Sequence, residues 1–297
     1  MKKKKVIVLG GSGFLGSHVA DMLSQKGYHV TIIDKIKSIW VNPDQVFIKG
    51  DILEPEKFLS ILKKTDYVYN FAAVSDIGEA NKNPEETVKI NIFGLVKLLN
   101  LCVKSKIKKY IHASTIYVSG THGGFYKSSK LAAESYIKEF FNIKKLKYNI
   151  LRYGSIYGPR SDETNGLHNI IKDLIRKNKI IYSGDPEAMR DYVHVIDAAR
   201  VSMKVLSKEF DNKTIIISGP QTFKIKDVLK IISEISGVKN ISYIAKNEVK
   251  RYSHYLRTPY SIDEKEENFS MKYTDNLNVD IGQGIRSLIK ELRKEYK

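Results

Sequence analysis

A glycine-rich run near the start of the chain constrains its fold more than any other feature. Residues Gly10 to Gly16 read Gly-Gly-Ser-Gly-Phe-Leu-Gly and separate a short apolar run, 6–9, from a helical pattern that begins at Ser17. Glycine permits a tight turn and the close approach of backbone to a pyrophosphate, and a helix start offers free N–H groups. This order predicts a dinucleotide site at Gly10, Ser12, Gly13, Phe14, Leu15 and Gly16.

An aspartate that closes the second apolar run bears on the choice of cofactor. Asp34 lies eighteen residues after Gly16. A carboxylate at this place can accept hydrogen bonds from ribose hydroxyls and repels a 2′-phosphate, which favours NAD over NADP. Lys35 argues the other way, since an ammonium could meet a phosphate. Asp51 and Ile52, after the third apolar run, could flank the adenine or form an ordinary turn.

Strands and helices alternate through the first half of the chain. Apolar runs typical of buried strands fall at residues 6–9, 28–33, 46–48, 67–71, 110–112 and 148–152. Helical patterns lie among them at residues 17–26, 54–63, 84–104 and 126–141. Repeated βα units of this length predict an α/β fold, a Rossmann-type doubly wound parallel sheet with helices on both faces.

The regular alternation of strands and helices ends after Arg152. Loop signals surround one helix between Gly154 and Arg190, and a strand at 215–217 could rejoin the sheet. Helices are expected near 225–236 and 282–297. We expect a dinucleotide-binding domain from residues 1–155 with about 190–219, and a smaller discontinuous substrate-binding lid from about 156–189 with 220–297. Without a Gly- or Ser-rich linker, the two parts should pack around a cleft.

Composition and charge narrow the class of protein. The formal net charge is +17, but the lysines are scattered, with no long basic block and no clustered aromatic side chains, so we expect no nucleic-acid partner. The basic residues at the start are followed by an apolar run too short for a secretory signal or a membrane span. The single cysteine, Cys102, falls in an apolar helical pattern, which fits the reducing cytoplasm. No metal site is expected.

The most specific pattern in the chain is a threonine, Thr115, followed by a tyrosine and a lysine four residues apart, Tyr126 and Lys130. A tyrosine and a lysine four residues apart share one face of any helix, so their spacing alone fits a solvated surface pair equally well. With the other motifs, the chain resembles the extended branch of the short-chain dehydrogenase/reductase superfamily, the nucleotide-sugar epimerases and dehydratases. The resemblance spans 5–199 and rests on Gly10 to Gly16, Gly50-Asp51-Ile52, Asn70 to Ala73, Asn91 to Gly94, Ala113 to Thr115, Tyr126 to Lys130, Leu151 to Tyr153, Gly158-Pro159-Arg160 and Arg190 to Asp197.

The resemblance implies roles for these residues. Tyr126 would be the base that takes a proton from a sugar hydroxyl, Lys130 would favour the phenolate and bind the nicotinamide ribose, and Thr115 would hydrogen-bond the same hydroxyl. NAD would be the cofactor, held also by Phe71, Ala72, Ala73, Asn91, Ala113 and Tyr153. Substrate contacts would come from Ser75, Ser155, Arg160, Arg190 and Arg257, with Arg190 on the diphosphate. An interface salt bridge is the alternative for Arg190, and His194 is expected to make structural hydrogen bonds.

Three departures from the family pattern qualify what the resemblance implies. Dehydrating relatives usually carry an acidic pair after the threonine, and here Ile116 and Tyr117 follow Thr115, which disfavours dehydration. The connection from Thr115 to Tyr126 is short, and we expect it to open the sugar pocket to a bulky sugar such as a heptose. Ser155 stands where many relatives have asparagine, so its contact could differ.

The expected activity is NAD-dependent oxidation at C4 of a nucleotide-activated sugar. Return of the hydride to the other face makes a 4-epimerase, whereas release of the keto sugar makes a C4 dehydrogenase, and the sequence does not separate them. A non-catalytic NAD-binding regulator is a rival that would be expected to lose the tyrosine or the lysine. The resemblance also implies a homodimer formed through residues 84–104 and 126–141, although their apolar faces could equally be core.

Overall fold

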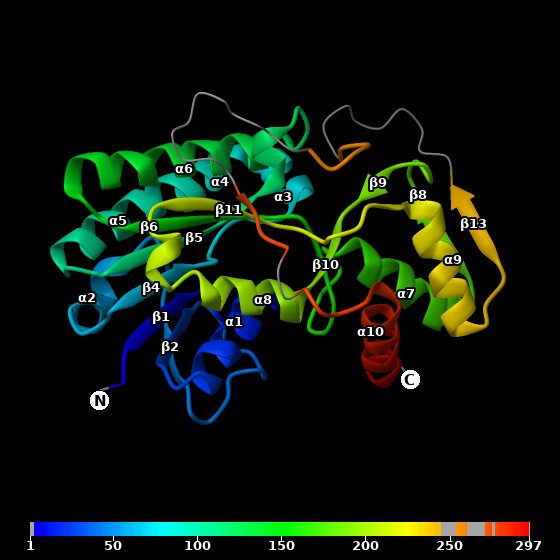
Figure 1. The fold of residues 1–297 in the computed structure, drawn as a ribbon, viewed down its shortest axis with the longest axis horizontal. Coiled ribbons are helices and arrows are strands. Elements are labelled where there is room, and N and C mark those ends of the chain that lie inside the picture. Colours follow the sequence, from blue (N-terminus) through cyan, green and yellow to red (C-terminus); the bar gives the residue numbers. More distant parts are fainter. Residues whose placement is uncertain (1–2, 245–253, 260–270, 275–276, 297) are drawn as a thin grey trace.

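An eight-stranded parallel sheet lies at the centre of the structure, a computed structural model that describes residues 3–244, 254–259, 271–274 and 277–296. Its spatial order is β14-β11-β6-β5-β4-β1-β2-β3 (Figure 1). The strands are β1 (Lys5–Leu9), β2 (His29–Asp34), β3 (Val46–Lys49), β4 (Tyr67–Asn70), β5 (Lys109–Thr115), β6 (Tyr148–Tyr153), β11 (Lys213–Ile217) and β14 (Met271–Lys272). The predicted parallel sheet is confirmed, and the strand expected at 215–217 pairs with β6.

Helices cover both faces of the sheet because the side chains of its strands alternate between two cores. In β1, Val6 and Val8 belong to the core under α1 and α8, whereas Ile7 and Leu9 belong to the core under α2, α5 and α6. Figure 1 shows these layers above and below the sheet. The helices are α1 (Phe14–Gln25), α2 (Leu59–Leu62), α3 (Ile77–Lys82), α4 (Pro84–Val88), α5 (Leu95–Lys104), α6 (Gly124–Lys144) and α8 (Val195–Lys204).

Several helices differ from the predicted ones in detail. The helix expected at 84–104 is α4 and α5 joined by a π-helical turn at Lys89–Gly94, and the helix expected at 54–63 is a 3-10 turn at Pro55–Phe58 followed by α2. The sequence pattern did not indicate α3. Its start is capped by Asp76, whose carboxylate accepts the N–H of Glu79 at 2.7 Å, and it ends just before Pro84, where a proline disfavours helix in the preceding residue.

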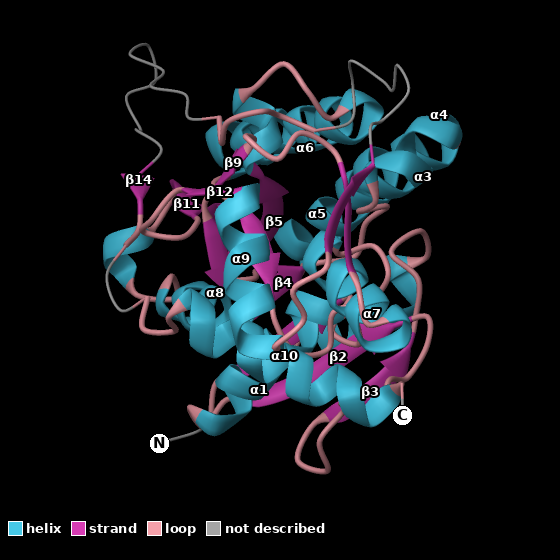
Figure 2. Cartoon of the chain, turned by 90° about the vertical axis from the view of Figure 1, so that its right-hand side faces the viewer, coloured by secondary structure: helices cyan, strands magenta, loops and turns pink. Residues whose placement is uncertain are grey.

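A second, smaller core lies at one end of the molecule, where α7, α9 and α10 gather (Figure 2). Its elements are β7 (Ser155–Tyr157), α7 (Gly166–Lys177), β8 (Ile180–Ser183), β9 (Met189–Arg190), β10 (Tyr192–His194), β12 (Phe223–Lys224), α9 (Ile225–Ser236), β13 (Ile241–Ile244) and α10 (Ile281–Glu295). The strands pair as β7 with β10, β8 with β13 and β9 with β12. The domain boundaries stay a prediction, except that Met271 and Lys272, expected in the lid, form β14 beside β11 in the central sheet.

Some classes of site find no support in the part of the chain that the structure describes. No helix there has the length and apolar character needed to cross a membrane. No group of three or more His, Cys, Asp or Glu side chains among these residues could hold a metal ion. Cys102 is buried in the core under α5, and burial raises the pKa of its thiol, which keeps it unreactive.

Candidate active site

The glycine-rich run forms the turn between β1 and α1. Gly10 has a φ of +71°, and a Cβ atom there would lie 2.6 Å from the backbone nitrogen of Ala72. A Cβ atom on Gly16 would lie 2.2 Å from the carbonyl oxygen of Gly10. α1 begins at Phe14 with no side-chain cap and no acidic residue in its first turn, so its first N–H groups are open to an anion. The turn has the geometry that a pyrophosphate cradle requires.

Asp34 faces this turn from the end of β2. Its Oδ2 accepts the N–H of Ser12 at 3.0 Å, and its Oδ1 accepts the N–H of Lys35 at 2.7 Å. The ammonium of Lys35 lies 3.1 Å from the carboxylate of Asp51. Partial burial raises the pKa of Asp51, but hydrogen bonds from the Leu53 N–H and from Lys35 outweigh burial and leave the pKa below its usual value. Lys35 therefore forms an ion pair with Asp51, while the carboxylate of Asp34 lies beside the glycine-rich turn.

A cleft of about 290 Å³ opens beside Asp34 and the turn, at the carboxyl ends of the strands, where such sheets bind ligands. Its walls contain the predicted residues Gly10, Gly13, Asp34, Lys35, Asp51, Ile52, Phe71, Ala72, Ala73 and Ser75. Ser75, predicted as a substrate contact, therefore lies in the same cleft as the predicted cofactor residues. The other predicted residues of the glycine-rich turn, Ser12, Phe14, Leu15 and Gly16, do not line this cleft.

Thr115, Tyr126 and Lys130 come together between the end of β5 and the start of α6. Thr115 is the last residue of β5, and Tyr126 lies in the first turn of α6. Lys130 lies one turn further on, where its Nζ donates to the carbonyl oxygen of Ala113 at 2.8 Å and lies 5.9 Å from the ring centroid of Tyr126. The structure thus assembles the predicted trio and places Ala113 beside it as the partner of Lys130.

Burial shifts the pKa values of both titratable members of the trio. It raises the pKa of Tyr126 to about 12, although the side-chain hydrogen bond with Thr115 lowers it. It lowers the pKa of Lys130 to about 8, although the charge of Glu134 acts in the opposite direction. Burial thus opposes the ionised form of each group, but perturbed pKa values on a tyrosine and a lysine that adjoin a hydroxyl group mark a candidate site for proton transfer with a bound hydroxyl.

Asn91 holds the first turn of α6 against the loop after β4. Its Oδ1 accepts the N–H of Val74 at 2.8 Å, and its Nδ2 donates to the carbonyl oxygen of Val74 at 3.0 Å and to the Ser129 hydroxyl at 2.9 Å. The Ser129 hydroxyl donates in turn to the carbonyl oxygen of Tyr126 at 2.8 Å. Asn91, expected to contact the cofactor, is therefore a buried structural amide whose amide group is bonded within the protein.

A buried ion pair fixes the other side of α6. Glu134 and Arg152 are only 2% and 8% exposed, and the guanidinium donates to the carboxylate from both Nε, at 3.0 and 3.2 Å, and NH2, at 2.6 Å. The Ser114 hydroxyl donates to the same carboxylate at 2.5 Å. Sequence reasoning missed Glu134 as a member of the site, although its spacing of four residues from Lys130 places both on one helix face.

Arg190 and Ser155 meet at one aromatic ring. The guanidinium of Arg190 lies 4.4 Å from the ring centroid of Tyr255, and the Ser155 hydroxyl lies 3.1 Å from the Tyr255 hydroxyl. Among the described residues no carboxylate pairs with Arg190, so the alternative of an interface salt bridge finds no support. Arg257 is exposed two residues after Tyr255. The substrate contacts of Arg190, Ser155 and Arg257 stay predictions.

Two predicted site residues have other partners. Arg160, expected to contact substrate, pairs with Asp21 of α1 at 2.7 Å and lies 4.9 Å from the ring centroid of Trp40. Tyr153, expected to contact the cofactor, is buried with its hydroxyl 2.6 Å from that of Ser202 in α8. Both side chains are occupied in packing because β6 and the residues after it adjoin the α1 and α8 layer. His194, by contrast, makes the expected structural bond, as it caps α8 by accepting the N–H of Ile196.

Comparisons with known proteins place this site in a family context. The family model described as "NAD dependent epimerase/dehydratase family" matches residues 6–218. The crystal structure of a UDP-glucose 4-epimerase from Thermotoga maritima with UDP-glucose is 26% identical, with a TM-score of 0.85 over 99% of this chain and 100% of that one. A UDP-glucuronic acid 4-epimerase from Bacillus cereus, in complex with UDP-glucuronic acid and NAD, is 25% identical, with a TM-score of 0.85 over 98% of this chain and 100% of that one.

The sequence relatives agree with the structural ones. An uncharacterised UDP-glucose epimerase of Bacillus subtilis is 26% identical over 79% of this chain and 83% of its own length. Relatives with other reactions also match, among them a UDP-glucuronic acid decarboxylase of Arabidopsis thaliana at 25% identity over 79% of this chain and 58% of the relative. The similarity therefore spans several reactions on nucleotide sugars.

Proposed function

Since the chain belongs to the NAD dependent epimerase/dehydratase family, we propose that it interconverts the C4 epimers of a UDP-sugar with NAD as its cofactor. The observation that carries this proposal is that Tyr126, Lys130 and Thr115 come together at the carboxyl end of β5. Asn91 ties the first turn of α6 to the loop after β4, whose residues Ala73 and Ser75 line the cleft. The UDP-sugar 4-epimerases among the similar structures support the choice of reaction and of nucleotide.

The residues present fit NAD. The turn at Gly10 and the open N–H groups of α1 suit a pyrophosphate, and Asp34 stands where its carboxylate can accept the ribose hydroxyls. Asp51, which pairs with Lys35, competes with a 2′-phosphate for the ammonium and so supports NAD over NADP. Bound in this site, NAD would supply the hydride acceptor for oxidation at C4 and the hydride donor for the return step.

In the proposed reaction, proton transfer is the task of Tyr126, Lys130 and Thr115. Tyr126 takes the proton of the C4 hydroxyl, and the ammonium of Lys130, 5.9 Å from the ring, stabilises the phenolate. Thr115, which hydrogen-bonds Tyr126, is placed to orient the same hydroxyl. Ile116 and Tyr117 supply no acid and base for elimination, which supports epimerisation over dehydration. Arg190, next to Tyr255, is the candidate contact for the diphosphate.

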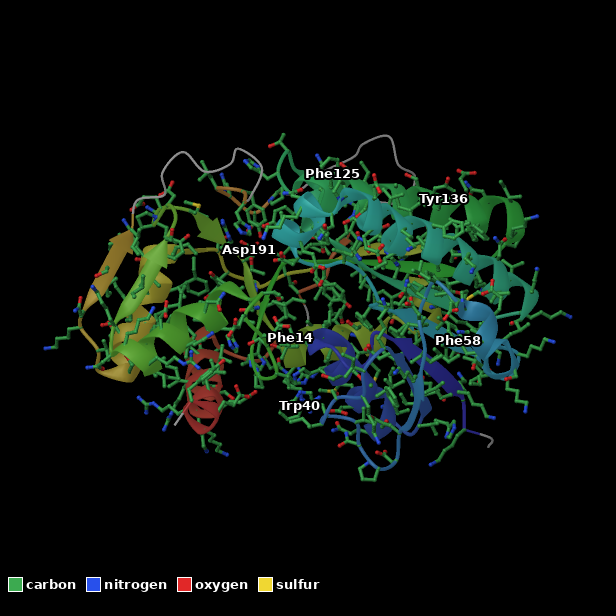
Figure 3. The ribbon with its side chains drawn as sticks, turned by 180° about the vertical axis from the view of Figure 1, so that it is seen from behind. Phe14, Trp40, Phe58, Phe125, Tyr136 and Asp191 are labelled. Atoms are coloured by element: carbon green, nitrogen blue, oxygen red, sulfur yellow. The ribbon has the colours of Figure 1, made fainter. Side chains whose placement is uncertain are left out.

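We also propose a homodimer formed through the outer face of α4, α5 and α6. Large apolar side chains are exposed there on α6 and on the π-helical turn, among them Phe93, Phe125, Tyr136 and Ile143 at 59%, 53%, 46% and 68% exposure. Phe125 and Tyr136 lie along the same outer edge of the molecule (Figure 3). An exposed apolar face of this kind is typical of a contact between subunits.

The test is product analysis with purified protein and UDP-glucose, UDP-glucuronic acid and UDP-N-acetylglucosamine. We expect one of them to give a product of unchanged mass with inverted C4 and no lasting NADH absorbance. The Tyr126→Phe variant, which keeps the ring, is the matched control and should lose turnover while it still binds NAD. A product lighter by two hydrogens, with NADH accumulating, would replace epimerase by net dehydrogenase. NAD binding without any turnover of a nucleotide sugar would contradict the proposal.

A further inference from the structure

Tyr117 links the catalytic tyrosine to the segment 254–259. Its ring centroid lies 6.4 Å from that of Tyr126, in an edge-to-face arrangement at 74°, and 4.9 Å from that of Tyr255. The hydroxyl of Tyr117 lies 2.7 Å from Nδ1 of His254, in hydrogen-bonding contact. Since Tyr255 also contacts Arg190, a row of side chains runs from Tyr126 through Tyr117 and Tyr255 to the candidate diphosphate contact.

The short connection before Tyr126 folds onto the same ring. A Cβ atom on Gly123, which has a φ of +106°, would lie 3.0 Å from Cδ1 of Tyr117 and 3.3 Å from its Cβ. On the other side of the connection, a Cβ atom on Gly120 would lie 3.0 Å from the side chain of Pro259. The short connection from Thr115 to Tyr126 therefore packs against Tyr117 and Pro259, and the expectation that it opens the sugar pocket to a heptose stays a prediction.

Tyr117 presents an apolar edge to this space. Burial raises the pKa of its hydroxyl, so the side chain is neutral across the pH range of enzyme assays. The bond to His254 engages the hydroxyl, which leaves the ring as the surface beside Tyr126. The edge-to-face arrangement with Tyr126 and the contact with Tyr255 stabilise this position of the ring.

We propose that Tyr117 determines which sugars the enzyme accepts: its ring is the wall of the sugar site between Tyr126 and Tyr255, and it limits the size of the sugar substituent that faces it. The inference rests on the proposed function, since it names the substrate selection of the same site. It favours unsubstituted hexoses over sugars with a bulky substituent, because a rigid ring held by Gly123, His254 and Tyr255 cannot yield to a larger group.

The experiment compares kcat/KM for UDP-glucose with the values for UDP-N-acetylglucosamine and a UDP-heptose, in wild type, Tyr117→Ala and Tyr117→Phe. In Tyr117→Ala we expect the preference for UDP-glucose to fall by about tenfold or more against at least one bulky sugar. Tyr117→Phe keeps the ring and should keep the preference within about threefold. NAD binding by each variant checks that the cofactor cleft is intact, and Tyr117→Leu replaces Tyr117→Ala if the latter does not fold.

The outcomes separate the two proposals. If wild type turns over a nucleotide sugar but Tyr117→Ala and Tyr117→Leu keep its preference, Tyr117 does not select the sugar, and the inference is overturned while the function stands. Loss of the preference in Tyr117→Phe as well would assign selection to the hydroxyl and its bond to His254 rather than to the ring, which also overturns it. If wild type turns over none of the sugars, the proposed function fails first.

Discussion

Replacing Lys130 with methionine should have opposite effects on activity and on stability. The side chain is 4% exposed, its Nζ donates to the carbonyl oxygen of Ala113, and its charge lies 5.9 Å from the ring of Tyr126. Methionine has a similar length and no charge, so it removes the ammonium without opening a large cavity. The substitution therefore isolates what the buried charge contributes to the proposed reaction and what it costs the fold.

The loss of activity follows from the distance. With the 5.9 Å from Nζ to the ring centroid taken as the separation of ammonium and phenolate, the two charges interact by about 2.8 kcal/mol at an effective dielectric constant of about 20. Without the ammonium, the phenolate of Tyr126 would lose stabilisation of this order, which raises its pKa by about two units. Where only the ionised fraction of Tyr126 reacts, kcat/KM near neutral pH should fall by about 100-fold.

The gain in stability follows from the pKa of Lys130, which burial lowers from 10.5 to about 8. Because the folded-state pKa lies below the unfolded one, the charged form is penalised in the folded protein by about 3 kcal/mol. The penalty is fully present below pH 8 and disappears as the pH rises from about 8 to 10.5. The lost hydrogen bond to Ala113 offsets about 1 kcal/mol. We expect a net gain of about 2 kcal/mol near pH 7 and, because the hydrogen bond is still lost when the penalty is gone, a loss of up to about 1 kcal/mol near pH 10.5.

Two measurements test this reasoning. Steady-state kinetics at saturating NAD give the change in kcat/KM, and urea unfolding of the cofactor-free protein near pH 7 and near pH 10.5 gives the free energy of unfolding. Lys144→Met, at an exposed position in the last turn of α6, is the matched control and should change neither quantity much. An activity loss below about fivefold, or a variant less stable than wild type near pH 7, would refute the electrostatic account.

Three further predictions concern the cofactor, the fold and the assembly. Asp34→Ser should weaken NAD binding and strengthen NADP binding, each about tenfold by calorimetry, because the carboxylate no longer repels a 2′-phosphate; an unchanged ratio would contradict this role. Glu134→Leu should lower the free energy of unfolding by about 3 to 5 kcal/mol because it removes the carboxylate that neutralises the buried guanidinium of Arg152, and adding Arg152→Leu should recover most of the loss; additive losses in urea unfolding would count against it. Tyr136→Glu should convert the proposed dimer into a monomer in light scattering, and a monomeric wild type would disprove the dimer.

The sheet and the glycine-rich turn could be predicted because their signals are local. Each strand of the first half is a short apolar run, and each turn follows it within a few residues. Local sequence patterns therefore predict the order of the strands and helices. The grouping of Thr115, Tyr126 and Lys130 could also be predicted, since Tyr126 and Lys130 are four residues apart and Thr115 ends the preceding strand. In these cases one segment of sequence contains most of the information that places the residue.

The residues that the sequence did not place depend on contacts between distant segments. Tyr117 meets Tyr255 across more than a hundred residues, and β14 joins the sheet beside β11 with only two residues. Arg160 is a related case, because its motif resembles the family while its guanidinium pairs with Asp21 of α1, and its substrate contact stays a prediction. Motif spacing identifies a residue type at a position in the chain, but it does not identify the side chain that a distant helix brings to it.

The line of Tyr126, Lys130 and Glu134 along one face of α6 explains how the site can hold a charge that burial opposes. Burial moves both pKa values against the ionised pair, to about 12 for Tyr126 and about 8 for Lys130. Glu134 raises the pKa of Lys130, and Arg152 keeps that carboxylate in place. Glu134 is therefore a positioning residue whose loss should lower the pKa of Lys130 and move the alkaline limit of activity to lower pH. The pH profile of Glu134→Gln tests this directly, because a purely structural role would lower activity equally at all pH values.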